Sequence, residues 1–408
     1  MTIQPRDDGE DTSIMMPMLV GMTSKHRGAL VDLATELAIA NAGFEGSLPK
    51  ATAEALADLT RSMNCYYSNL IEGHNTHPID IERALNNEYS DDQEKRDLQI
   101  EAKAHIEVQK WIDDGNLDGK TTSPDGICEI HKRFCERLPD ELLWVENVES
   151  GVCEHVVPGE FRTGYVEVGR HIPISPGAIP RFMETFDDYF RKLGKSDRII
   201  SVAGAHHRFL WIHPFLDGNG RVARLMSHAM LSEAIGTTGL WSIARGLARN
   251  KNRYYEHLAA CDKIRQGDLD GRGSRSEAAL AEFSEFFIKI CIDQVAFMEQ
   301  LMDPKRLQIR IERWANEEVA VGNLSKKAAG VLRAILRDGQ LGRGEIPAIT
   351  NTTDRQARNI VSELTKLGIV RSKTSRAPLC IAFPAKYAGY WLPSLFPDDT
   401  NIDQNRQT

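Results

Sequence analysis

Residues 213–224 read HPFLDGNGRVAR, and this stretch predicts a loop that leads into a helix and binds an anion. Gly218 and Gly220 flank Asn219, and a glycine lets backbone N–H groups approach an anion closely because it carries no Cβ. The residues that follow have helical apolar spacing and contain no helix breaker. We therefore expect the loop to open a helix whose N-terminus favours negative charge.

Charged and titratable side chains accompany this loop in an order that suits phosphate chemistry. His213 is a candidate general base, because the pKa of a free imidazole, about 6.5, lies near neutral pH. Asp217 offers the hard oxygen ligand that Mg²⁺ shares with substrate phosphates. Arg221 and Arg224 lie three residues apart, so one helix face would present both to a polyphosphate. Each residue alone is commonplace, but the set predicts a phosphate-transfer site.

The stretch resembles the signature of the Fic family, HxFx(D/E)GN(G/K)RxxR, with every specified position filled. Most Fic proteins are protein adenylyltransferases, which move AMP from ATP to a hydroxyl side chain of a target protein and release pyrophosphate. The resemblance implies that His213 deprotonates this hydroxyl and that Asp217 holds Mg²⁺ at the phosphates of ATP. The phosphate-binding residues would be Gly218, Asn219, Gly220, Arg221 and Arg224.

A second motif lies upstream, where residues 68–73 read SNLIEG. It matches the family's inhibitory motif (S/T)xxxE(G/N) at Ser68, Glu72 and Gly73, and its position resembles the class with an N-terminal, intramolecular inhibitory helix. Residues 52–72 have high helix propensity and apolar residues at helical spacing, and Gly73 suits a helix stop. The resemblance implies that Glu72 reaches Arg224 and competes with the γ-phosphate of ATP. The alternative is a solvated glutamate near a helix end.

Residues 158–180 read PGEFRTGYVEVGRHIPISPGAIP, and their alternating valines, glycines and prolines predict a β-hairpin. This segment resembles the Fic flap, which docks a target segment by strand addition beside the active site. An ordinary surface hairpin is the alternative. The docking residues would be Arg162, Thr163, Gly164, Tyr165 and Val166.

Residues 250–258, NKNRYYEHL, resemble the family's helix near the adenine pocket. Tyr254 and Tyr255 are therefore candidate neighbours of the nucleotide, although aromatic residues at helical positions more often belong to a core. Helical patterns also cover most of the remaining chain. The clearest predicted helices span residues 92–113, 124–144, 199–211 and 276–318.

The segment from residue 324 to 386 differs from the rest in charge. It holds twelve basic and four acidic residues, a net charge of +8, whereas the whole chain carries −8. Short helices at 328–336 and 343–349, a third helix after Thr353 and strands near 369–373 and 379–383 resemble a winged helix-turn-helix. Such modules bind DNA or dock proteins. The candidate DNA contacts are Arg355, Arg358, Asn359, Arg371 and Lys373.

Composition bounds the other functional classes. The chain of 408 residues is 41% hydrophobic and contains no apolar run of about 18 residues, so we expect no membrane span. Its seven cysteines form no CxxC pair and no zinc-type spacing, which favours reduced thiols and a cytoplasmic location. Residues 1–14 are polar and without periodicity, and we expect them to be disordered.

These observations predict a mainly α fold, a Fic-type helical bundle with a β-hairpin flap, followed by a small winged-helix domain. The expected divisions are a tail at 1–14, a helical region with the inhibitory helix at 15–110, a catalytic core at 111–320, the winged helix at 324–387 and a tail at 388–408. The function expected is an ATP- and Mg²⁺-dependent protein adenylyltransferase that acts on a Tyr, Thr or Ser hydroxyl or on itself. The alternatives are a de-AMPylating enzyme and a DNA-binding regulator with a nucleotide-sensing core, and a homodimer stays open.

Overall fold

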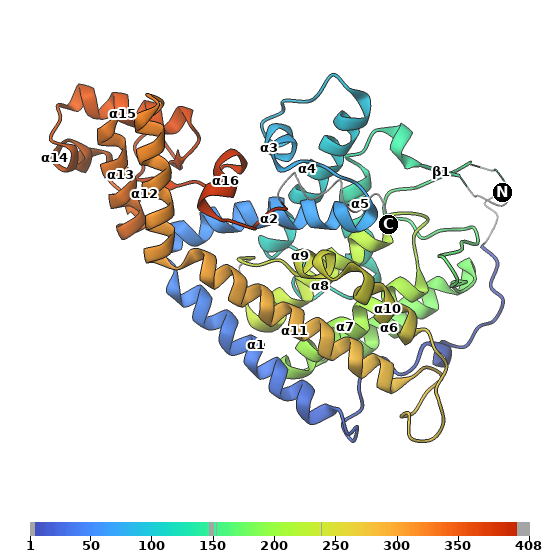
Figure 1. The fold of residues 1–408 in the computed structure, drawn as a ribbon. Coiled ribbons are helices and arrows are strands. Elements are labelled where there is room, and N and C mark those ends of the chain that lie inside the picture. The colour runs from blue at the N-terminus through green and yellow to red at the C-terminus, as the bar shows by residue number, and fades with distance from the viewer. Residues whose placement is uncertain (1–4, 147–150, 152, 238, 398–408) are drawn as a thin grey trace. The chain divides into compact units, whose positions relative to one another are not determined.

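The computed structural model describes residues 5–146, 151, 153–237 and 239–397, and it is mainly helical (Figure 1). The chain divides into two compact units, one formed by residues 1–42 with 64–294 and one by 43–63 with 295–408. We call them the signature unit and the C-terminal unit. Helices α1 (Arg27–Ser47), α2 (Lys50–Glu72) and α11 (Glu277–Met302) contribute residues to both units, so the predicted boundaries at 110 and 320 do not coincide with this division.

The signature unit is built around α7 (Lys195–Ile212) and α8 (Asn219–Ile235), which flank the signature loop and pack on each other. Both helices are buried along most of their length, and their buried residues include polar and charged side chains beside small and apolar ones. A buried hydrogen bond of 2.8 Å between His206 Nδ1 and Ser227 Oγ joins them. The other helices of this unit are α3 (Pro78–Leu85), α4 (Gln93–Asp113), α5 (Pro124–Cys135), α6 (Ile179–Phe190), α9 (Ile243–Arg249) and α10 (Lys251–Cys261).

The predicted hairpin at 158–180 is wrong in its position. The structure has an antiparallel pair earlier in the chain, β1 (Trp144–Glu146) with β2 (Cys153–His155), and only one bridge, Val168 with His171, inside the predicted range. Backbone groups of the 158–180 segment bond elsewhere: the N–H of Arg162 donates to the carbonyl of Pro214. Proline has no N–H to donate to a strand ladder, and this segment holds prolines at 158, 173, 176 and 180.

Two predicted helices end earlier than their apolar pattern indicates. The helix expected at 124–144 stops at Cys135, and Pro139 then introduces a short 3-10 turn before β1. The helix expected at 276–318 is two helices, α11 and α12 (Pro304–Ala320), separated at Asp303. The carboxylate of Asp303 accepts a hydrogen bond from the N–H of Arg306, and Pro304 starts the next helix, so this pair is an N-terminal cap within a continuous apolar pattern.

The N-terminal segment is ordered where the structure describes it, from residue 5, so the prediction of disorder is wrong for residues 5–14. Asp7 forms an ion pair of 2.7 Å with Arg181, and Glu10 accepts bonds of 2.7 and 2.6 Å from the N–H and hydroxyl of Ser175. A 3-10 turn follows at Thr12–Met15. The acidic composition that predicted disorder instead supplies acceptors for donors of α6 and the 158–180 segment. Residues 1–4 lie outside the described chain.

The C-terminal unit contains the basic segment. Thr353 and Gln356 form the predicted capping box at the start of α15 (Asp354–Lys366), whose Ala357, Ile360 and Leu364 are buried. The predicted tail at 388–408 is wrong up to the last described residue, 397, because a final helix buries Trp391; residues 398–408 are not described. The remaining elements are α13 (Lys326–Asp338), α14 (Ile346–Thr350), α16 (Ala385–Trp391) and a sheet of order β3–β5–β4 from Gln340–Leu341, Leu379–Ile381 and Val370–Arg371. None of the described helices is long and apolar enough to cross a membrane.

Candidate active site

The signature loop is held by its own side chains. Phe215 is completely buried, and its ring stacks on that of His131 with the centroids 3.9 Å apart. The side-chain amide of Asn219 accepts a bond of 3.0 Å from the N–H of Phe215 and donates one of 2.8 Å to its carbonyl. Gly218 has φ +79° at the N-cap of α8, a conformation that favours glycine. The side chain of Asn219 therefore closes the loop, whereas the phosphate contact predicted for residues 218–220 is one of backbone N–H groups and stays a prediction.

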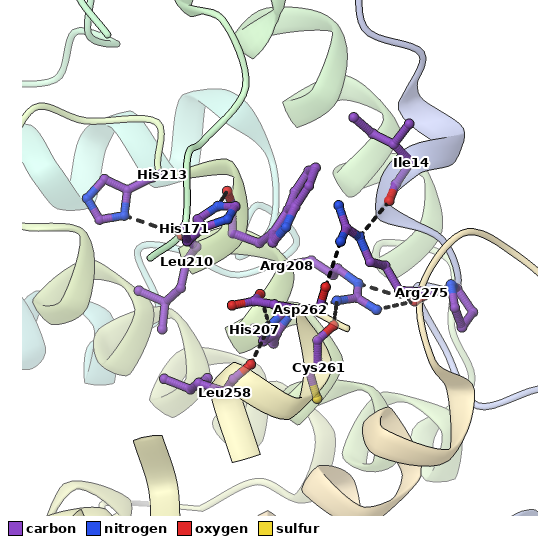
Figure 2. A network of polar contacts seen from close by, with 12 residues as sticks. Ile14, His171, His207, Arg208, Leu210, His213, Leu258, Cys261, Asp262 and Arg275 are labelled. Carbon is purple, nitrogen blue, oxygen red and sulfur yellow. Dashed lines mark hydrogen bonds and ion pairs between the residues drawn. The ribbon is translucent and has the colours of Figure 1, made fainter. Parts of the chain in front are cut away.

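His213 ends α7 with φ +51° and lies in a setting that suits a general base (Figure 2). Its Nδ1 is 3.3 Å from the carbonyl oxygen of Leu210, an atom that only accepts, so Nδ1 carries the proton and Nε2 keeps a lone pair. Burial lowers the pKa of His213 to about 4, and the charge of Arg162 acts in the same direction. The imidazole is therefore neutral at neutral pH and able to accept a proton at Nε2.

A polar network anchors the helix that carries His213, as Figure 2 shows. Arg208, also on α7, is buried and donates to the carbonyl of Pro17 at 3.0 Å and to Nδ1 of His207 at 2.7 Å. The other ring nitrogen of His207 is 3.0 Å from Asp262, and Arg275 donates to the carbonyls of Ile14 and Asp262. The network links α7 to the N-terminal segment and to the connection between α10 and α11, so hydrogen bonds hold the helix that carries His213 in position.

Arg162 was predicted to dock a target, but the structure gives it another position. Its guanidinium is buried and donates to three backbone carbonyls, those of His213 at 2.8 Å, Gly164 at 2.8 Å and Ile174 at 2.7 Å. Each of its three nitrogens thus donates to the protein's own backbone. Arg162 instead links the backbone of His213 to both ends of the flap, residues 162–174.

The second arginine of the signature, Arg224, is paired with the upstream motif. Its Nε donates to the hydroxyl of Ser68 at 2.8 Å, and its Nη2 is 2.5 Å from Oε1 of Glu72. Burial by itself would raise the pKa of Glu72, but the charge of Arg224 and its hydrogen bond outweigh burial, so the pKa is lowered. A Cβ at Gly220 would overlap the Glu72 carboxylate, which therefore lies directly over the loop. Gly73, with φ +93°, ends the helix.

Arg221 is buried and lies beside a carboxylate that the sequence analysis missed. Its Nε is 3.3 Å from Oε1 of Glu101, and Oε2 of the same carboxylate lies 3.1 Å from Nδ1 of His74. The N–H at Nε is not aligned with that oxygen and has no hydrogen-bond acceptor among the described residues. Arg221 thus has a buried donor from which no described residue accepts a hydrogen bond. No local motif marks Glu101, because it is brought to Arg221 by the packing of α4 on α8.

The residues present fit a polyphosphate with a bound divalent cation. The Glu72 carboxylate already places an anionic oxygen over Gly220 and against Arg224, which shows that this space accepts negative charge. Asp217 is exposed at the tip of the loop, where it would hold Mg²⁺. Clusters of three or more His, Cys, Asp or Glu side chains suited to a metal are absent from the described residues. One carboxylate is sufficient when substrate phosphates complete the coordination of Mg²⁺.

The two tyrosines predicted near the nucleotide differ in exposure. Tyr254 is buried, and its hydroxyl lies 2.7 Å from Nε2 of His206 in the core of the signature unit. It cannot face a nucleotide in this conformation, and the prediction is corrected. Tyr255 is 44% exposed, and its hydroxyl donates to the carbonyl of Ile71 on α2 at 3.2 Å. Tyr255 alone stays a candidate contact.

The candidate DNA contacts also separate into two groups. Arg355, Arg358 and Asn359 are exposed on α15. By contrast, Arg371 forms an ion pair with Asp58, and Nζ of Lys373 is 3.0 Å from Oε2 of Glu54. These strand and loop cations are partly neutralised by acidic residues of α2 that belong to the same unit.

Comparison with known proteins defines the class of this site. Residues 121–231 match the family model described as Fic/DOC family. A solved Fic family protein from Desulfovibrio desulfuricans G20 has a TM-score of 0.52 at 15% identity, covering 89% of this chain and 98% of that one. Fic-1 from C. elegans has a TM-score of 0.51 at 18% identity, covering 68% of this chain and 73% of that one. The chain therefore carries a Fic domain with the Fic fold.

The proteins that match by sequence carry the name of an enzyme. "Protein adenylyltransferase Fic" of Drosophila willistoni is 34% identical over 110 residues, 26% of this chain and 22% of that protein. The protein of the same name from Nematostella vectensis is 30% identical over 209 residues, 50% of this chain and 43% of that protein. The chain is thus homologous to Fic protein adenylyltransferases, but the match spans less than half the length of these relatives.

Proposed function

We propose that the protein is an ATP- and Mg²⁺-dependent protein adenylyltransferase that modifies a Tyr, Thr or Ser hydroxyl and is inhibited by its own Glu72. The observation that carries this proposal is the state of His213: its Nδ1 is tied to the Leu210 carbonyl, and its pKa is about 4, so Nε2 is a free base at neutral pH. The Fic domain and the named relatives support the adenylyl donor.

In the proposed reaction, Nε2 of His213 takes the proton of the target hydroxyl while the hydroxyl oxygen forms a bond to the α-phosphorus of ATP. The bond between that phosphorus and the bridging oxygen breaks, and pyrophosphate leaves with the bonding electrons. Arg221 and Arg224 would neutralise the departing charge, and the N-terminus of α8 would contribute its backbone donors. Mg²⁺ held by Asp217 would supply further charge stabilisation on the phosphates.

Inhibition by Glu72 follows from the same contacts. Arg224 cannot bind a phosphate oxygen through a donor that Glu72 already occupies, and the carboxylate would repel the phosphate chain. Productive ATP binding therefore requires Glu72 to leave Arg224. The same carboxylate could position a water molecule for removal of AMP from a modified target, which keeps the reverse reaction as the alternative enzyme function.

The experiment that tests the proposal is transfer of label from α-labelled ATP to the protein itself and to proteins of a cell extract. Wild type, Glu72→Gly and His213→Ala would be compared at equal concentration with Mg²⁺ present. Label that rises in Glu72→Gly and is lost in the double variant with His213→Ala would support enzyme, inhibitor and base together. If Glu72→Gly is not labelled while it still binds ATP, the transfer proposal fails.

A second function is favoured by the exposed face of α15 and the +8 charge of residues 324–386. We propose that residues 324–387 of the C-terminal unit are a winged helix that binds DNA through Arg355, Arg358 and Asn359. Binding that weakens steeply with salt and disappears on truncation after residue 322 would support it. Binding that is absent, or insensitive to salt, would refute it.

A further inference from the structure

His213 lines a cavity of about 540 Å³ to which the proposed reaction, as described above, assigns no role. Its walls come from the β1–β2 pair, from the flap and from the signature loop. The β1–β2 pair contributes Val145, Glu146 and Glu154. The flap contributes Tyr165, Val166, Glu167, Gly169 and Ile172, and the signature loop contributes His213 and Leu216. In the proposed reaction, a target hydroxyl would approach Nε2 of His213 through this space.

The charge in this cavity has one sign. Glu146, Glu154 and Glu167 supply three carboxylates, and the described lining includes no Lys or Arg. Within the described residues, none of the three forms an ion pair, whereas acidic residues elsewhere in the unit commonly do. Glu154 also lies close to the flap backbone, since a Cβ on Gly164 would be 2.8 Å from its Oε2. Its charge is therefore held where a docked segment would run.

Apolar side chains accompany these charges. Ile172 is 71% exposed and Tyr165 is 44% exposed, and residues 167–170 between them are exposed as well. The hydroxyl of Tyr165 donates to Asp8 of the N-terminal segment at 2.7 Å, which fixes the ring at the edge of the cavity. Exposed apolar groups held in place beside charges of one sign are typical of a surface that binds a polypeptide.

Other occupants fit this cavity less well. ATP is a polyanion, and three carboxylates repel it. A metal ion requires carboxylates close enough to share it, and such groupings do not occur among the described residues. A segment with Lys or Arg complements the three charges, and it can present a hydroxyl to His213 at the same time.

We infer that this cavity selects the target of the proposed adenylyl transfer, and that it favours acceptor hydroxyls flanked by Lys or Arg and an apolar residue. The inference rests on the proposed function, because it takes His213 as the base that the hydroxyl must reach. Glu146, Glu154 and Glu167 are specificity-determining residues that recognise the cationic flank. They bind the target, whereas His213 accepts the proton of its hydroxyl.

The test uses the full chain carrying Glu72→Gly and peptides of equal length that differ only in the flanks of a central Tyr or Thr, with Lys in one series and Glu in the other. We expect kcat/KM to be roughly ten-fold or more higher for the Lys series at low salt, and the preference to shrink as salt rises. The variant Glu146→Lys/Glu154→Lys/Glu167→Lys should invert the preference. The matched control Glu36→Lys/Glu184→Lys/Glu282→Lys has the same net charge change on exposed positions outside the cavity, and should keep it.

A binding measurement separates failure of this inference from failure of the proposed function. Peptides with Ala in place of the acceptor cannot be modified, and their binding is read by fluorescence anisotropy without ATP. Tighter binding of the Lys series, lost in the single variants Glu146→Gln, Glu154→Gln or Glu167→Gln, would support target selection by this cavity even if no AMP is transferred. Equal binding of both series, or a preference that the triple charge reversal leaves unchanged, would overturn it. The Gln variants preserve side-chain size, so they keep the test valid if the triple variant does not fold.

Discussion

Replacing Glu72 by glycine removes the carboxylate from Arg224 and from the space over Gly220. One charge-assisted hydrogen bond is lost, and such a bond contributes about 1.5–3 kcal/mol. Because ATP must displace this bond before its phosphates reach Arg224, we expect Glu72→Gly to bind Mg²⁺–ATP roughly 10- to 150-fold more tightly than wild type. The hydrogen bond from Arg224 to Ser68 persists and keeps the guanidinium in position.

The affinity is best measured by titration calorimetry, with Glu72→Gln as a graded intermediate. Glutamine retains the size of the side chain and its steric overlap with the phosphate site, but loses the charge, so its gain in affinity should be smaller than that of glycine. His213→Ala is the matched control, since it should abolish transfer and leave the ATP dissociation constant of the Glu72→Gly protein within about two-fold. Unfolding midpoints of all variants would show that each protein is folded.

The refuting result is a dissociation constant for ATP that is the same in wild type and in Glu72→Gly. That result would mean that the ion pair between Glu72 and Arg224 does not compete with phosphate. A gain in Glu72→Gln equal to that in Glu72→Gly would show that charge alone, and not the volume over Gly220, opposes the nucleotide.

Three further outcomes follow from the site and the C-terminal unit. In Glu72→Gly, kcat/KM should stay flat from about pH 6 to 8 and fall as pH drops through about 4, where His213 gains a proton. Arg162→Met removes a nearby positive charge and should move this fall to higher pH. An unchanged pH profile would show that the charge of Arg162 does not lower the pKa of His213. His105 and His206 have pKa values of about 3 because they are buried, well below the value of about 6.5 in an unfolded chain. Below pH 6.5 the unfolded state therefore binds more protons than the folded state does. The unfolding midpoint should be highest above pH 6.5 and decline toward pH 4, with a shallower slope in His206→Gln. If the C-terminal unit binds DNA, Arg355→Glu/Arg358→Glu should weaken binding more than Arg371→Glu does, because Arg371 already pairs with Asp58; equal losses in a filter-binding assay would contradict this order.

The sequence was most informative where local chemistry determines the conformation. The loop of the signature and the helix after it follow from the glycines and from the absence of breakers, and the structure begins α8 at Asn219. The capping box at Thr353 predicts the start of α15 for the same reason, since its partners lie three residues apart. The carboxylate of Glu72 was expected at Arg224 through family resemblance, and the structure places it there.

The sequence was least informative where residues act through distant partners. Arg162 stands in a motif that suggested target docking, but its donors are taken up by carbonyls of His213 and Ile174, which no local pattern reveals. Glu101 contacts Arg221 only because α4 packs on α8. The acidic segment before residue 15 resembled a disordered tail, because the donors that bind it lie more than 150 residues away.

The pairing of Glu72 with Arg224 has a consequence for how the protein would respond to its own abundance. Both residues belong to one chain, so the effective concentration of the carboxylate at the arginine is set by the fold and not by the amount of protein. Dilution or overproduction would leave the fraction of released molecules unchanged. In the proposed regulation, a stimulus that separates Glu72 from Arg224 would then act within one chain, and the response would be first order in protein.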